Sequence, residues 1–85
     1  MSKKNKIEYY IQNFKKYNIK IPWKIFVKIM TSHYGCDMVK KKGSARLFIR
    51  GNIRITAHEP HGRDDNVSKL DRQRVIKYLI NKLEL

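Results

Sequence analysis

The segment SARLFIRGNIRITAH, from Ser44 to His58, constrains the fold more strongly than any other part of the chain. Apolar and polar residues alternate on both sides of a Gly-Asn pair, which is the pattern of a β-hairpin. A three-residue loop over 50–52 would make one face of this hairpin wholly apolar, and burial of one face specifies the register of a strand. The apolar pairs predicted in that register are Ile49 with Ile53, Leu47 with Ile55, and Ala45 with Ala57.

The opposite face of the hairpin follows from the same register. It would carry Arg46, Phe48, Arg54, Thr56 and His58. Basic side chains around an aromatic ring can contact phosphates and stack on bases, so this face is a candidate surface for nucleic acid. A half-buried sheet also has a polar outer face for purely structural reasons, so the pattern fits an ordinary solvated surface as well.

Apolar residues at helical spacing lie on both sides of the hairpin. One stripe over residues 3–17 predicts a helix, and a second stripe begins after Pro22. Residues 36–40 predict a short strand, and Ser68, with Asp71 three residues on, predicts the start of a final helix. This order predicts an α+β fold: a three-stranded antiparallel sheet with its helices on one face. The stripes consist of Ile7, Tyr10, Ile11, Phe14 and Tyr17, then Trp23, Phe26, Val27 and Met30, and finally Ile76, Leu79, Ile80 and Leu83.

A length of 85 residues predicts one domain, with residues 1–20 as an N-terminal helical extension of the unit formed by residues 21–85. Twenty Lys and Arg against seven Asp and Glu give a net charge of +13, which is typical of a protein that binds a polyanion. RNA, DNA, an anionic membrane and an acidic protein all fit that description. The single cysteine, Cys36, excludes an internal disulfide, and no apolar run approaches the length of a membrane span. We therefore expect a cytoplasmic protein.

Four motifs follow one another after Pro22. They are the helix PWKIFVKIMTSHYG, the Gly-Ser turn into the strand GSARLFI, the segment HEPH after the hairpin, and the basic closing helix LDRQRVIKYL. In this order and spacing, residues 22–83 resemble the HicA toxins, small ribonucleases of bacterial toxin–antitoxin pairs. The resemblance implies a fold like that of double-stranded-RNA-binding domains for residues 21–85. It also implies cleavage of RNA and an acidic HicB-like antitoxin as partner.

The chain departs from the HicA pattern at one important position. Many HicA toxins carry a catalytic histidine just after the Gly-Ser turn, where this chain has Ala45 and Arg46. Either His58 or His61 would then carry the activity, since histidine can move protons near neutral pH, or the protein would cleave poorly or not at all. Access to the basic face favours His58, and the Pro-His element of the family favours His61. The sequence does not rank the two.

Further basic residues are candidates for nucleic-acid contact. The run Lys40, Lys41 and Lys42 fits a phosphate clamp as well as a solvated turn, and Arg63 follows the histidines in the same loop. His-x-x-His supplies only two ligands and no recognised zinc spacing is present, so we expect no metal and no cofactor. Cys36 is predicted to be a buried apolar residue rather than a nucleophile. The acidic residues expected to orient the histidines or arginines are Glu59, Asp64 and Asp65.

Three functions are compatible with these features. The first is a toxin that binds and cleaves RNA as a metal-independent endoribonuclease and is masked by an acidic antitoxin. The second is a non-catalytic module that binds double-stranded RNA or DNA. The third is an interaction protein whose basic helix meets a membrane or an acidic partner. We expect the first, without membrane association, and the sequence leaves a homodimer open.

Overall fold

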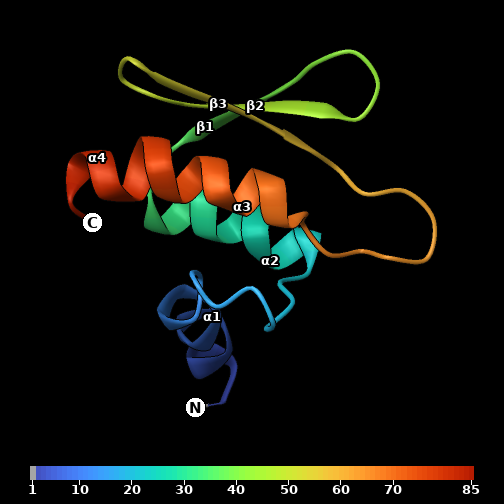
Figure 1. The fold of residues 1–85 in the computed structure, drawn as a ribbon, viewed down its shortest axis with the longest axis vertical. Coiled ribbons are helices and arrows are strands. Elements are labelled where there is room, and N and C mark those ends of the chain that lie inside the picture. The colour runs from blue at the N-terminus through green and yellow to red at the C-terminus, as the bar shows by residue number, and fades with distance from the viewer. Residues whose placement is uncertain (1) are drawn as a thin grey trace.

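The computed structural model describes residues 2–85, and their side chains from residue 6 onward. Within this range the chain forms three strands and three helical regions, two of which include a π-helical segment (Figure 1). No helix in these residues is both long and apolar enough to cross a bilayer. The elements are α1 Ser2–Gln12, α2 Trp23–Lys28 with η1 Ile29–His33, β1 Asp37–Lys40, β2 Ala45–Arg50, β3 Ile53–His58, and α3 Lys69–Val75 with η2 Ile76–Ile80 and α4 Asn81–Leu83.

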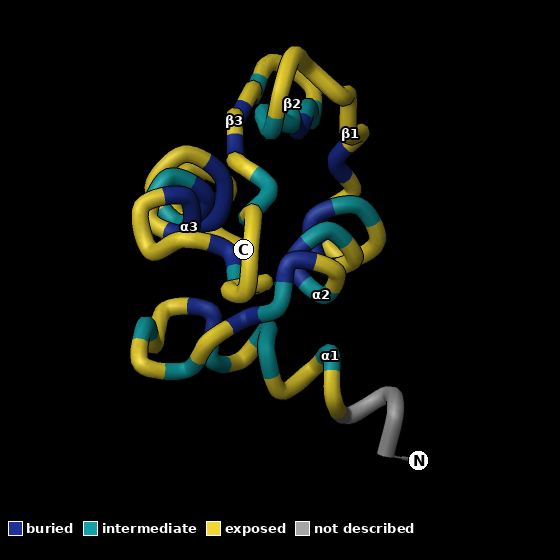
Figure 2. The backbone as a smooth tube through the Cα atoms, turned by 90° about the vertical axis from the view of Figure 1, so that its right-hand side faces the viewer, coloured by how far each residue is buried: buried dark blue, intermediate teal, exposed yellow. Residues whose placement is uncertain are grey.

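The sheet is antiparallel, with the strand order β1-β2-β3. Helices α2 and α3 lie side by side beneath one face of the sheet, and α1 lies on the far side of these two helices (Figures 1 and 2). The buried positions gather between the sheet and the helices, whereas the other sheet face has no helix over it in the part of the chain described (Figure 2). The predicted α+β fold with a three-stranded antiparallel sheet is therefore confirmed.

The register of the β2–β3 hairpin differs from the predicted one. A two-residue loop, Gly51-Asn52, joins Arg50 to its partner Ile53. Gly51 has a φ of +59°, consistent with the glycine at the first central position of a type II′ hairpin turn. A shift of one residue turns a strand over, so β2 presents Phe48 to the helices where Leu47 and Ile49 were expected. The prediction of a three-residue loop and a wholly apolar inner face was wrong.

The aromatic ring of Phe48 accounts for the observed register. Phe48 is fully buried and meets Trp23 and Phe26 edge-on, with ring centroids 6.4 and 5.6 Å apart. A phenyl ring buries a large apolar area and gains further from such edge-to-face contacts. Leu47 and Ile49 remain half-buried on the open face instead. One aromatic side chain at the centre of the strand therefore outweighs two aliphatic ones.

The core extends beyond the sheet into the N-terminal segment. Trp23, Phe26 and Met30 are buried, as predicted. Phe14 is buried as well and stacks on Phe26, with ring centroids 6.2 Å apart. The segment between α1 and α2 therefore packs as part of the same core. The other buried apolar residues are Ile21, Ile29, Tyr34, Cys36, Ile55, Ala57, Val67, Val75, Leu79 and Ile80.

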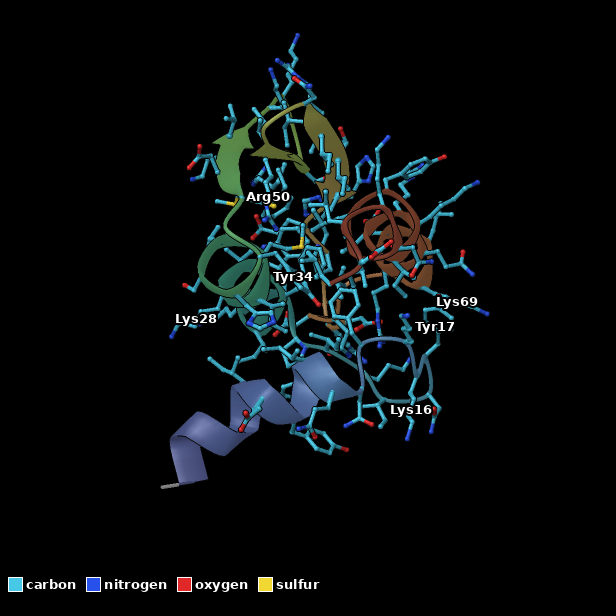
Figure 3. The ribbon with its side chains drawn as sticks, turned by 90° about the vertical axis from the view of Figure 1, so that its left-hand side faces the viewer. Lys16, Tyr17, Lys28, Tyr34, Arg50 and Lys69 are labelled. Carbon is cyan, nitrogen blue, oxygen red and sulfur yellow. The ribbon has the colours of Figure 1, made fainter. Side chains whose placement is uncertain are left out.

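The buried Arg72 ties this N-terminal segment to α3. The guanidinium carbon of Arg72 lies 5.6 Å from the centre of the Phe14 ring and 5.3 Å from the centre of the Tyr17 ring. Figure 3 shows Tyr17 beside Lys69 of α3. Burial lowers the pKa of Arg72, and the neighbouring Tyr17 opposes that shift. We call this arrangement the Arg72 clamp. Its guanidinium donates to the backbone carbonyl oxygens of Asn13 at 3.2 Å, Phe14 at 2.7 Å, Lys16 at 3.2 Å and Ile19 at 2.8 Å.

Candidate functional site

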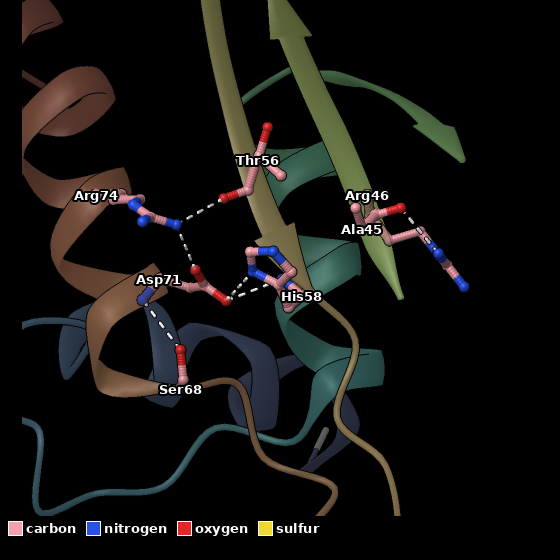
Figure 4. Close-up of polar contacts among 7 residues, drawn as sticks. All are labelled: Ala45, Arg46, Thr56, His58, Ser68, Asp71 and Arg74. Atoms are coloured by element: carbon pink, nitrogen blue, oxygen red, sulfur yellow. Dashed lines mark hydrogen bonds and ion pairs between the residues drawn. The ribbon is translucent and has the colours of Figure 1, made fainter. Parts of the chain in front are cut away.

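The outer edge of β3 is covered by two side chains of α3. The buried carboxylate of Asp71 accepts a hydrogen bond from the backbone N–H of His58 at 2.9 Å (Figure 4). Arg74 donates to the carbonyl oxygen of Thr56 at 3.4 Å and to Asp71 at 3.2 Å. Ser68 Oγ accepts the backbone N–H of Asp71 at 3.1 Å, which confirms the predicted N-cap and fixes the first turn of α3 beside the strand.

The imidazole of His58 lies beside the same carboxylate. Its Nδ1 is 3.7 Å from Asp71 Oδ2, and 54% of the histidine side chain is exposed, against 2% for Asp71. The separation is too long for a hydrogen bond, and it allows electrostatic attraction when the imidazole carries a proton. One side of the ring therefore faces a fixed negative charge while the rest is open to solvent. An accessible imidazole with a carboxylate behind it is suited to receiving or donating a proton.

Ala45, the residue after the Gly-Ser turn, lies directly opposite His58 in the β2–β3 ladder. Side chains of directly opposed residues share one face of a sheet and have Cβ atoms about 5 Å apart. The open face of the sheet therefore has the small side chain of Ala45 next to the imidazole of His58, as Figure 4 shows. Ala45 leaves room beside the ring for a ligand that approaches along this face.

A shallow cavity of about 410 Å³ runs along β3 and α3 next to His58. We call it the β3–α3 groove. Its polar lining combines two guanidinium groups, Arg54 and Arg74, with the imidazole and with Tyr78, whose side chain is half exposed. Guanidinium groups bind phosphate oxygens, and an exposed phenol ring can stack on a base. The complete lining is Arg54, Ile55, Thr56, His58, Arg74 and Tyr78.

His61 lies in the exposed loop that leads from β3 to α3. The far end of this loop is fixed by a bridge between Asn66 and Pro22 and by a hydrogen bond from Val67 N–H to the carbonyl of Ile21 at 2.9 Å. In the described part of the chain, the side chain of His61 makes no ion pair or hydrogen bond. Of the two predicted histidines, only His58 therefore lies against a carboxylate and beside arginines.

Two residues predicted for the outer basic face lie on the inner face of the sheet. Phe48 is in the core, so its ring is not available to stack on a base. Arg46 forms an ion pair with Glu59 at 2.9 Å, donates to the carbonyl of Gly43 at 2.9 Å, and is only 14% exposed. This part of the predicted surface was wrong because it followed from the wrong register. Arg54 and His58 do lie on the open face, as predicted, since the register error concerned β2.

The lysine run forms an exposed turn at the same end of the sheet as His58. Lys40 pairs with Arg46 in the first ladder, and the backbone N–H of Glu59 donates to Ser44 at 2.9 Å, so the turn and the loop after β3 are neighbours. The remaining predicted nucleic-acid contacts are all exposed. They are Lys41 and Lys42 in the turn, Arg54 on β3 and Arg63 in the loop after β3.

Asp64 and Cys36 have structural surroundings that the described residues define. Asp64 accepts hydrogen bonds from the backbone and the side chain of Asn66, at 3.0 and 2.9 Å, and so shapes the loop. Within residues 2–85 no group of three or more metal-ligating side chains comes together. Cys36 is buried as predicted, and burial is the main cause that raises the pKa of its thiol.

Sequence reasoning missed three residues of the site: Arg74 and Tyr78 in the lining of the β3–α3 groove, and Asp71 beside His58. Asp71 was interpreted only as part of a helix start, and Arg74 and Tyr78 were not singled out. Their spacing of three and four residues places them on one side of the final helix, separate from its apolar stripe. That polar stripe was the available signal, although which strand it would meet depends on the tertiary fold.

Comparison of the chain with family models, with curated proteins and with solved structures finds no match.

Proposed function

We propose that this protein binds RNA along the β3–α3 groove and cleaves it without a metal, with His58 as the group that moves the proton. The observation that carries the proposal is the place of His58: exposed, 3.7 Å from the buried Asp71 carboxylate, and directly across the ladder from Ala45. Ala45 is the position at which HicA toxins, which the sequence resembles, commonly carry their catalytic histidine. His58 thus offers an imidazole on the neighbouring strand where the expected one is missing.

The proposed reaction is the transesterification that RNA undergoes through its own 2′-hydroxyl. His58 takes the proton of the 2′-hydroxyl, the 2′-oxygen attacks the adjacent phosphorus, and the bond to the 5′-oxygen of the next nucleotide breaks. The leaving oxygen receives a proton from the imidazolium or from water. Arg54 and Arg74 would stabilise the charge that builds up on the phosphorane, and Tyr78 would stack on a flanking base. The products are a 2′,3′-cyclic phosphate and a 5′-hydroxyl end.

The biological role that fits this chemistry is that of a toxin in a toxin–antitoxin pair. A net charge of +13 and an exposed lysine turn at the same end of the sheet as His58 would supply affinity for any RNA backbone. The same charge suits an acidic HicB-like antitoxin that masks the groove. The order of strands and helices after Pro22 supports a fold like that of double-stranded-RNA-binding domains.

A non-catalytic RNA- or DNA-binding module is the second candidate, and one observation favours it. Asp71 is already occupied by the backbone N–H of His58 and by Arg74, so the carboxylate is needed to cover the edge of β3. Its distance of 3.7 Å from the imidazole leaves His58 without a hydrogen-bonded orienting partner. In this case the lysine turn and Arg54 would hold nucleic acid, and no proton transfer would follow.

Cleavage of a synthetic RNA by the purified protein separates the two candidates. The parent protein should produce 2′,3′-cyclic phosphate ends in the presence of EDTA. His58→Ala should lower the rate about a hundredfold or more. His61→Ala is the matched control and should retain activity, because His61 is not among the residues that line the groove. Loss of activity in His61→Ala alone would move the assignment to the loop. Tight RNA binding without cleavage by the parent would establish the binding module.

The role as a toxin has its own test in cells. Induced expression of the parent should arrest growth and degrade mRNA, and His58→Ala should do neither. Co-expression of a small acidic protein encoded beside it should restore growth. Arrest that persists unchanged in His58→Ala would contradict a toxin that acts through cleavage at this site.

A further inference from the structure

The two edges of the sheet differ in whether side chains cover their backbone N–H and C=O groups. On β3, Asp71 accepts the outward-facing N–H of His58, and Arg74 donates to the outward-facing carbonyl of Thr56. The outer edge of β1 has no such cover from the side chains described, those of residues 6–85, and all four residues of β1 are exposed. Two of them, Met38 and Val39, are apolar and 36% and 39% exposed. An uncovered strand edge with apolar side chains is a template for pairing with another strand.

The ladder between β1 and β2 determines which backbone groups of β1 are free. In an antiparallel pair, alternate residues turn their N–H and C=O groups toward the same neighbour. Lys41 N–H donates to the carbonyl of Ala45 at 3.0 Å, which places Lys41 on the β2 side, and Val39 two positions earlier therefore also faces β2. Met38 and Lys40 consequently turn their N–H and C=O groups outward. These are the groups that an added strand would meet.

We propose that β1 pairs with β1 of a second copy of this chain, antiparallel and related by a two-fold axis at Val39, so that the two sheets join into one. In this register Met38 of each copy lies opposite Lys40 of the other, and their outward-facing backbone groups bond to each other. About a two-fold axis perpendicular to the sheet, two opposed residues must both have even numbers or both have odd numbers. The pairs 38 with 40 and 37 with 41 meet that condition. The proposal does not depend on the proposed ribonuclease activity.

Charge complementarity identifies the second copy as the partner. The strand and the residue after it read DMVKK, with an acidic residue first and a lysine four positions later. Pairing about Val39 places Asp37 of each copy opposite Lys41 of the other, on the same face as the two valines. Opposite charges across an antiparallel pair are stabilising, and like charges are not. A chain with a net charge of +13 thus has an edge on which two copies attract each other locally.

The same register keeps the lysine turns of the two copies apart. Each turn follows the C-terminal end of its own β1, and antiparallel pairing directs the two C-terminal ends in opposite directions. Cys36 N–H already donates to the carbonyl of Met30 at 2.9 Å, so a register shifted toward the N-terminus would need a backbone group that is in use. The separation of the lysine turns favours antiparallel over parallel pairing, and the bonded Cys36 N–H favours the axis at Val39 over an axis at Met38.

A pair of charge-reversal variants tests this register directly. The parent should show a concentration-dependent dimer in sedimentation or in light scattering after size exclusion. Asp37→Lys and Lys41→Asp should each be monomeric alone, because each places like charges opposite one another at both symmetry-related sites. Mixed in equal amounts, the two variants should form a heterodimer, because both sites then hold opposite charges. Lys28→Asp, a charge reversal on α2 away from β1, should leave the dimer unchanged.

A variant that removes a backbone N–H tests the same dimer without changing any charge. Met38→Pro removes the outward N–H, which β2 does not use, and proline is tolerated at such an edge position. It should weaken the dimer about tenfold or more while the circular dichroism spectrum stays that of the parent. A parent that stays monomeric at millimolar concentration would overturn the proposal. So would a dimer that neither charge reversal weakens, or reversed variants that are folded but do not associate when mixed. Binding of the edge to a strand of a different acidic protein instead of to itself would also overturn it.

Discussion

Asp71 is joined to His58 through the backbone N–H of the histidine at 2.9 Å, while the imidazole Nδ1 lies 3.7 Å from the same carboxylate oxygen. The carboxylate therefore supports the strand directly and the ring only through space. Holding the strand in place and influencing the imidazole are therefore separate roles within this residue pair. Changes at Asp71 should act first on stability, whereas changes at the His58 side chain should act on chemistry.

Asp71→Ala should destabilise the fold by about 2 kcal/mol, because it leaves a backbone N–H of β3 without an acceptor in a partly buried position. Asp71→Asn retains a side-chain oxygen at this place and should cost clearly less. Urea denaturation of the three proteins measures the difference. A loss of less than about 0.5 kcal/mol for the alanine variant would show that water replaces the carboxylate at the strand edge.

Arg72→Met should destabilise the protein by about 3 kcal/mol, because one buried and three partly buried carbonyl oxygens lose their donor at once. Arg72→Lys keeps the positive charge but not the planar fork of donors, so it should recover only part of the loss. Urea denaturation gives the free energies, and hydrogen exchange of residues 13–19 should increase in both variants. Gln73→Ala, at the next and exposed position of α3, is the control and should change neither quantity.

Arg54→Gln should weaken RNA binding and lower the slope of log affinity against log salt by about 0.7, since one phosphate contact is lost. Arg46→Gln is the matched control: Arg46 is bound to Glu59 on the inner face, so its removal should leave the slope unchanged. Fluorescence anisotropy with a labelled RNA at several salt concentrations measures both. An equal effect of the two variants would mean that RNA is not bound along the β3–α3 groove.

Alkaline pH should destabilise the protein. Burial raises the pKa of Tyr34 and, as the main cause, that of Cys36. Because the folded values lie above the unfolded ones, the contribution to stability is complete below the ordinary values of 9.0 for Cys36 and 10.0 for Tyr34, and it is lost as the pH rises through the folded values. Urea midpoints between neutral and strongly alkaline pH should therefore fall.

Tyr34→Phe keeps the buried ring and removes the ionising group, so it should flatten this alkaline loss. Tyr9→Phe, at an exposed tyrosine of α1, is the control and should follow the parent curve. If Tyr34→Phe loses stability with pH as steeply as the parent, ionisation of Tyr34 does not contribute to the loss.

Local patterns in the sequence predicted the fold class but not every contact. The helix start at Ser68 and the buried stripe of Trp23, Phe26 and Met30 depend on neighbours a few residues away, and both are confirmed. The register of the hairpin was predicted wrongly because aliphatic residues were counted without weighing the area of Phe48. Register depends on which strand face the helices cover, and that is decided by the whole core.

In the candidate site, too, local features were predicted from the sequence and contacts between distant elements were not. The sequence identified His58 and His61 as a pair but did not rank them, because the carboxylate that separates their environments lies in another element, at Asp71. The acceptors of Arg72 have no sequence signature at all, since every residue carries a carbonyl oxygen. Partners supplied by the backbone become visible only when the path of the chain is known.

The Arg72 clamp has a consequence for how this chain can change over time. Because the guanidinium recognises carbonyl oxygens, it depends on the course of the backbone between Asn13 and Ile19 and, among the side chains there, on the rings of Phe14 and Tyr17. Exposed positions in that stretch, such as Lys16 and Asn18, are thus free to diverge as long as the turn keeps its shape. Descendants of this sequence could acquire new surface chemistry there, whereas the arginine that holds the turn would be retained.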